Sequence, residues 1–140
     1  MIFSKILIPV DGSIHSDNAV KYGFDLAEMC GAKVILLHCH PPVPSGLGEP
    51  NFQKAIDTAT RNSYAILQKY MDDPQAEKIS LSDKTIGGDT TNSIITVSET
   101  EECDLIIMGS KGKSDLEGLL IGSVTHKVLN TANCPVLIIK

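Results

Sequence analysis

A chain of 140 residues is long enough for one domain with its own core, and 42% hydrophobic and 21% charged residues are ordinary values for a globular protein. The net charge of −5 argues against binding nucleic acid through bulk attraction, and no apolar run approaches the roughly 20 residues that span a membrane. The four cysteines are widely spaced and no signal-like segment opens the chain. We therefore expect free thiols in a cytoplasmic protein with one domain over residues 1–140.

Strand-like and helix-like patterns alternate from the start of the chain. Residues 3–10 and 33–39 are apolar runs typical of buried strands, and the segment between them has helical spacing and a stop signal at Gly31. Four prolines and two glycines in residues 41–50 predict an exposed, mobile loop. An amphipathic helix capped by Asn51 is expected to follow.

The second half of the chain continues this alternation. It predicts an edge strand at 79–85, a helix capped by Asp89 or Thr90, a buried strand at 104–108, a helix at 123–131 and a strand at 135–139. Such a sequence of elements indicates an α/β fold, in which right-handed crossovers place helices on both faces of a parallel sheet.

A glycine-rich segment follows the predicted strand at 104–108. Gly109 and Gly112 can take positive φ and let a ligand approach the backbone, and successive amides in such a turn form a nest for anions. Nine residues separate Gly112 from Gly122, and Ser123 after it is a candidate helix cap with a phosphate-binding hydroxyl. The spacing therefore predicts a phosphate site.

Two better-known phosphate loops do not fit this segment. A Walker A motif needs glycine where Ile107 stands, and no G-x-G-x-x-G follows a predicted strand. The spacing G-x2-G-x9-G-[S/T] instead resembles the ATP-binding members of the universal stress protein family. Lys5–Ser13, Val34–Cys39, Gly122–Leu129 and Cys134–Ile139 also resemble that family, in its order.

The resemblance implies a single doubly wound domain of the adenine nucleotide alpha hydrolase-like type, with five parallel strands in the order 3-2-1-4-5. The winding then reverses between the first and fourth strands, so Asp11 and Gly109 at their ends face one crevice. The residues expected around a nucleotide are Pro9, Val10, Asp11, Cys39, Met108, Gly109, Ser110, Gly112, Lys113, Gly122, Ser123 and Val124.

The expected ligand is ATP with Mg²⁺. The end of the first strand would form one wall of the adenine pocket. By analogy with the family, the backbone of Cys39 would form hydrogen bonds with the edge of the adenine ring. Asp11 would hold the ribose hydroxyls or the Mg²⁺ ion. Two lysines make the glycine loop locally basic, whereas Asp115 and Glu117 repel phosphate unless they point outward or meet a metal ion.

The resemblance also implies a homodimer that pairs through Val136–Ile139, and a nucleotide-dependent regulator with a protein partner of unknown identity. We expect little or no turnover, because no group that would orient an attacking water is identifiable. Three alternatives stay open: AMP or a cyclic nucleotide as ligand, a slow ATPase or a phosphotransferase that modifies itself on Ser110 or Ser123, and a non-nucleotide interaction module. His38 and His40 supply only two ligands for zinc.

Overall fold

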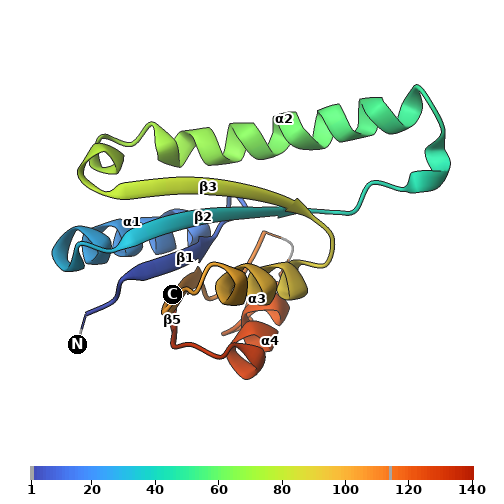
Figure 1. Ribbon diagram of the computed structural model, residues 1–140. Helices are drawn as coiled ribbons and strands as arrows, with labels where there is room; N and C mark the ends of the chain where they lie inside the picture. Colours follow the sequence, from blue (N-terminus) through green and yellow to red (C-terminus); the bar gives the residue numbers. More distant parts are fainter. Residues whose placement is uncertain (1, 114) are drawn as a thin grey trace.

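The structure, a computed structural model that describes residues 2–113 and 115–140, contains all the predicted strands and helices (Figure 1). The elements are β1 (Lys5–Pro9), α1 (Ile14–Cys30), β2 (Lys33–His40), α2 (Asn51–Met71), β3 (Ser80–Gly87), α3 (Thr90–Thr100), β4 (Leu105–Gly109), α4 (Ser123–Thr131) and β5 (Val136–Ile139), with short 3-10 helices at Ser45–Leu47 and Pro74–Lys78. None of the helices described is both long and apolar enough to pass through a bilayer.

The five strands form one sheet in the predicted order, β3-β2-β1-β4-β5, and every neighbouring pair is parallel. The central strand β1 pairs with β2 from Lys5 to Pro9 and with β4 at Ile6 and Leu7. From β1 the chain winds in one direction through β2 and β3, and in the other through β4 and β5. The carboxyl ends of β1 and β4 therefore flank the point where the winding reverses, which is where ligands bind in open α/β sheets.

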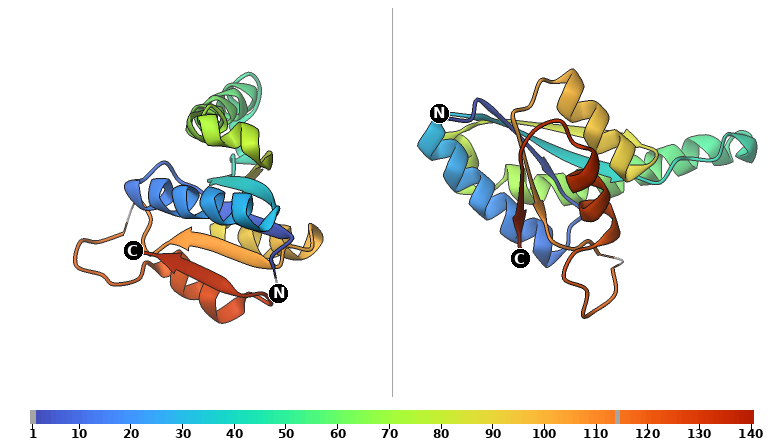
Figure 2. Two further views of the ribbon diagram at one scale, coloured as in Figure 1. Left: turned by 90° about the vertical axis from the view of Figure 1, so that its left-hand side faces the viewer. Right: turned by 90° about the horizontal axis from the view of Figure 1, so that it is seen from below.

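Hydrophobic side chains cover both faces of the sheet. Helices α1 and α2 pack on one face, with Phe24 and Leu67 in its core, whereas α3 and α4 pack on the other, with Ile94 and Val128 in its core. Figure 2 shows these two helical layers on either side of the strands. Alternate residues of a strand face opposite layers, and coverage of both faces is typical of a parallel sheet.

Helix α2 extends well past the sheet (Figure 2, right). Its buried residues all lie in its second half, within 63–70. The prediction that Asn51 caps this helix was wrong. Pro50 holds the cap position, with its carbonyl accepting a hydrogen bond from the Lys54 amide (3.1 Å), so Asn51 is already helical.

Other local predictions have mixed outcomes. Residues 41–50 are almost all exposed, as predicted, and β3 is an edge strand, as predicted. Asp89 is the cap of α3, because its side chain accepts a hydrogen bond from the Asn92 amide (2.9 Å). The prediction that Ser123 caps α4 was wrong: Gly122, with an extended backbone, holds that position, and Ser123 is the first helical residue.

Candidate functional site

A cavity of about 630 Å³ opens at the carboxyl ends of β1, β2 and β4. Its volume lies within the range of about 300–1,000 Å³ that is typical of small-molecule sites. Most of the predicted residues line it: Pro9, Val10, Asp11, Cys39, Met108, Gly109, Gly112, Lys113, Ser123 and Val124. The segments after the first and fourth strands therefore do face one cleft, as the strand order predicts.

Ser110 and Gly122 lie behind this lining. Ser110 is only 4% exposed, and its amide donates to the Ile139 carbonyl (2.8 Å). The Gly122 amide donates in turn to the Ser110 carbonyl (2.6 Å). Both residues thus shape the glycine loop rather than face the cavity. Of the two serines considered as phosphate acceptors, Ser123 is the one in the lining.

Asp11, directly after β1, is fixed in the cavity wall by three hydrogen bonds. Its Oδ1 accepts from the Ser13 amide (2.9 Å) and the Ser16 hydroxyl (2.7 Å), and its Oδ2 accepts from the Lys113 amide (2.8 Å). Burial raises the pKa of this carboxyl, but the hydrogen bonds outweigh burial and hold the pKa below its ordinary value of 3.8. The group is therefore ionised at neutral pH, and Oδ2 can accept one further bond.

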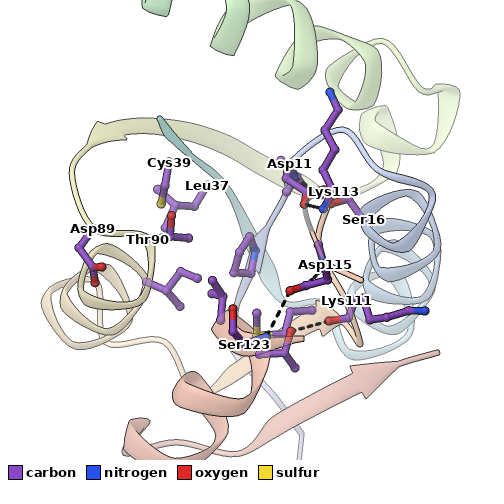
Figure 3. A pocket seen from close by; sticks show the side chains of 18 of the residues that line it. Asp11, Ser16, Leu37, Cys39, Asp89, Thr90, Lys111, Lys113, Asp115 and Ser123 are labelled. Atoms are coloured by element: carbon purple, nitrogen blue, oxygen red, sulfur yellow. Dashed lines mark hydrogen bonds between the residues drawn. The ribbon is translucent and has the colours of Figure 1, made fainter. Parts of the chain in front are cut away.

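Asp115 reaches into the cavity from the glycine loop (Figure 3). Its Oδ2 accepts a hydrogen bond from the Gly112 amide (2.6 Å), and its Oδ1 accepts one from the Ser123 amide (3.4 Å). The side chains of Lys111 and Lys113 extend away from the cavity in the same view. The hydrogen-bond donors that this loop turns toward the cavity are therefore backbone amides rather than the two lysine side chains.

The glycines of the loop are required by close packing. Positive φ, which glycine allows, is not the reason at Gly109 and Gly112, because the glycines with positive φ in the described residues lie elsewhere in the chain. A Cβ added at Gly109 would lie 2.7 Å from the Cβ of His15, and one at Gly112 would lie 2.9 Å from Oδ2 of Asp11. Side chains at these positions would thus displace α1 or the Asp11 carboxylate.

The other end of the cavity is largely apolar. Val10, Leu37, Ile94 and Met108 line it, together with Cys39 at the end of β2. Burial raises the pKa of the Cys39 thiol to about 11. The thiol is therefore protonated at neutral pH, so Cys39 contributes an uncharged surface on which a flat ring can lie.

Part of the lining was missed by sequence reasoning: Ser16, Leu37, Pro41, Gly88, Asp89, Thr90, Ile94 and Thr125. A signal for residues 88–90 was available, because they follow the carboxyl end of β3 on the side of the sheet where ligands bind. Thr125 supports the glycine loop, since its hydroxyl donates to the Gly109 carbonyl (2.9 Å). Nothing in the local pattern of α4 marks that contact.

His38 and His40 line a second cavity, of about 510 Å³, between β2 and α2. His38 is 8% exposed, and its Nδ1 lies 2.7 Å from the Ser63 hydroxyl on α2. Burial lowers the pKa of His38 and so favours the neutral ring. Within residues 2–113 and 115–140 there is no group of three or more His, Cys, Asp or Glu side chains placed to hold a metal ion.

Comparison with known proteins finds relatives over almost the whole chain. The model of the Universal stress protein family matches residues 3–140. A universal stress protein of Thermus aquaticus is 30% identical in an alignment that covers 99% of this chain and 100% of the relative. The solved structure of MJ0577, a universal stress protein of Methanocaldococcus jannaschii, is 28% identical with a TM-score of 0.89, covering 100% of this chain and 97% of that one.

Two more distant structures share the fold and contain nucleotides. One is a universal stress protein in complex with cAMP, 22% identical with a TM-score of 0.74 over 100% of this chain and 98% of that one. The other is a universal stress protein from Archaeoglobus fulgidus in complex with dAMP, 20% identical with a TM-score of 0.63 over 100% of both chains.

Proposed function

This chain belongs to the universal stress protein family, and on that basis we propose that it binds ATP in the cavity between β1 and β4 and acts as a nucleotide-dependent regulator with little or no turnover. The observation that supports this most is the arrangement of loop amides and an apolar wall around one cavity at the point where the winding reverses. The distant relatives in complex with cAMP and dAMP favour an adenine nucleotide as the class of ligand.

The cavity suggests how the nucleotide would lie. The adenine would pack against Val10 and Cys39 at the apolar end, and the phosphates would point toward Gly112 and Ser123. One ribose hydroxyl would donate to Oδ2 of Asp11, which can accept one further bond. In this orientation the adenine contacts the apolar end of the cavity, and the phosphates contact the polar end at the glycine loop.

In the alternative arrangement, Asp11 would hold Mg²⁺ instead of the ribose. Magnesium is usually held by one or two carboxylates together with substrate phosphates, and Asp11 presents an ionised carboxylate in the cavity wall. When bound, the ion would neutralise part of the charge on the phosphates. The role of Asp11 itself is to fix the Lys113 amide and to offer Oδ2 to the ligand.

The first prediction is that purified protein binds adenine nucleotides with a Kd on the order of micromolar, since the Gly112 amide, the Ser123 amide and the Asp11 carboxylate would each form a charge-assisted hydrogen bond of roughly 1.5–3 kcal/mol with the nucleotide. Chromatography of the supernatant after denaturation would identify a nucleotide that co-purifies, and calorimetric titration of the emptied protein would give the affinities for ATP, AMP and cAMP. Absence of bound nucleotide together with absence of heat on titration would leave the interaction module as the better description.

Incubation with γ-labelled ATP distinguishes binding from catalysis. Little release of phosphate and no label on the protein are expected for a regulator. Release well above background that is lost in Asp11→Ala would favour the ATPase instead, and label on Ser123 would favour the phosphotransferase, because this hydroxyl-bearing residue lines the cavity.

We further propose that the chain forms a homodimer through β5. Binding of this dimer to a protein partner would depend on whether nucleotide is bound. β5 is an edge strand and Leu137 on it is 41% exposed, and the unpaired backbone groups of such an edge favour pairing with a second strand. Sedimentation velocity should give twice the chain mass of 15.0 kDa. Leu137→Lys should give the monomer, whereas Leu47→Lys, at a leucine that is 43% exposed in the 3-10 helix Ser45–Leu47, should not.

The four cysteines are free thiols in the structure, which suits a reducing compartment. We therefore propose that the protein acts in the cytoplasm, and subcellular fractionation of the source cells would test this.

A further inference from the structure

Asp115 occupies the place that the proposed phosphate groups would take. Its two carboxylate oxygens accept hydrogen bonds from amides at opposite ends of the glycine loop, from Gly112 (2.6 Å) and from Ser123 (3.4 Å). Ser123 is the first residue of α4, so the carboxylate also lies at the positive end of that helix. A carboxylate bound in this way makes the same kind of contact that a phosphate would make.

Three further amides of the loop are also engaged. The Lys113 amide donates to Asp11 (2.8 Å), and the amides of Ser110 and Gly122 donate to backbone carbonyls. Each amide has one hydrogen to donate. A phosphate group can therefore bind the amides of Gly112 and Ser123 only if it replaces the Asp115 carboxylate.

Gly122 leaves free the space that the Asp115 carboxylate occupies. A Cβ added at Gly122 would overlap Oδ2 of Asp115, and it would lie 2.7 Å from Cγ of Asp115 and 3.1 Å from Cα of Lys111. The half-buried Asp115 side chain thus fits into space that only a glycine leaves free. Glu117, two residues further on, carries the same charge but is exposed.

We propose that Asp115 is a built-in competitor for the phosphate groups of the nucleotide, so that it weakens the binding of ATP without weakening the binding of the adenosine part. This inference rests on the proposed nucleotide site. A carboxylate that occupies the amides in about nine molecules of ten leaves ~10% of the protein competent for phosphate, which weakens the apparent affinity ~10-fold. Occupation of the site by ATP then requires Asp115 to turn out of the cavity.

The test compares four forms of the full chain: wild type, Asp115→Ala, Asp115→Asn and Glu117→Gln. Each is titrated calorimetrically with ATP, with adenosine and with inorganic tripolyphosphate, all in the presence of Mg²⁺. We expect ATP and tripolyphosphate to bind Asp115→Ala ~10-fold more tightly than wild type, and adenosine to bind both equally. Glu117→Gln removes the same charge from the same loop and should change ATP affinity by less than about 2-fold.

Several results would overturn the proposal. Unchanged or weaker ATP binding in both Asp115 variants would mean that the carboxylate does not compete, or that it helps to hold the metal ion. An equal gain in Glu117→Gln would reduce the effect to general charge repulsion. An equal gain for adenosine would place Asp115 against the nucleoside instead of the phosphates.

Tripolyphosphate separates this inference from the proposed function. Tighter binding of tripolyphosphate to Asp115→Ala, with no binding of adenosine or ATP to any form, would support competition at the amides and contradict the nucleotide site. Hydrogen exchange gives a second readout that needs no ligand: the Gly112 amide should exchange faster in Asp115→Ala than in wild type, and equal rates would contradict the contact.

Discussion

Replacing Gly109 by alanine is expected to lower the free energy of unfolding by about 3 kcal/mol, the upper end of the usual cost of overpacking. The added Cβ would lie 2.7 Å from Cβ of His15 and 2.9 Å from both its carbonyl carbon and its carbonyl oxygen. Two of these three atoms belong to the backbone of the first turn of α1, which cannot move aside as a flexible side chain can. Denaturant unfolding at neutral pH measures the change.

Gly46→Ala is the matched control for this prediction. A Cβ added at Gly46 has open space around it, and the backbone there does not have positive φ, so its cost should stay within about 0.5 kcal/mol. Equal stabilities of the two variants would mean that β4 and α1 can separate without cost. The close approach of strand and helix at Gly109 would then contribute nothing to the free energy of unfolding.

Asp11→Ala is expected to weaken ATP binding by ~10–100-fold, because it removes one charge-assisted contact worth roughly 1.5–3 kcal/mol. It would remove Oδ2 as an acceptor for the ribose or Mg²⁺, and it would also free the Lys113 amide from its anchor. Calorimetric titration with ATP and Mg²⁺ measures the loss. Both Asp11 and Asp115 bind amides of the same loop, yet their alanine variants should change ATP affinity in opposite directions.

The same variant has a predictable dependence of stability on pH. The pKa of Asp11 is lower in the folded protein than its ordinary value of 3.8, so its ionised form stabilises the fold. That stabilisation is fully present above pH 3.8 and is lost as the pH falls through the folded-state pKa. The stability difference between wild type and Asp11→Ala should therefore shrink in acid. A difference that stays constant down to the lowest pH at which both variants fold would mean that the carboxylate charge contributes nothing.

The sequence predicted the elements that have strong periodicity and clear end signals. Gly31 ends α1 in the left-handed conformation, as a terminal glycine often does, and the segment 123–131 is helical over the whole predicted range. The strand order came from the family resemblance. Given that order, the meeting of Asp11 and Gly109 in one cleft follows from the geometry of parallel sheets.

The sequence did not predict the residue that caps each of two helices, nor the contacts inside the glycine loop. At Ser123 and Asn51 the preference of the side chain for a cap placed the predicted cap one residue too late, because the preceding Gly122 and Pro50 also fit that position. The inward orientation of Asp115 depends on two amides of an irregular loop, one three residues before it and one eight residues after it. No periodic pattern encodes such a contact.

The hydrogen bonds behind the cavity also tie two regions of the protein together. The Gly122 amide binds the Ser110 carbonyl, and the Ser110 amide binds Ile139, the last residue of β5. A shift of the glycine loop on ligand binding would therefore be transmitted to the outermost strand. If two chains associate along that strand, thermodynamic reciprocity requires that association change nucleotide affinity by the same factor by which nucleotide changes association.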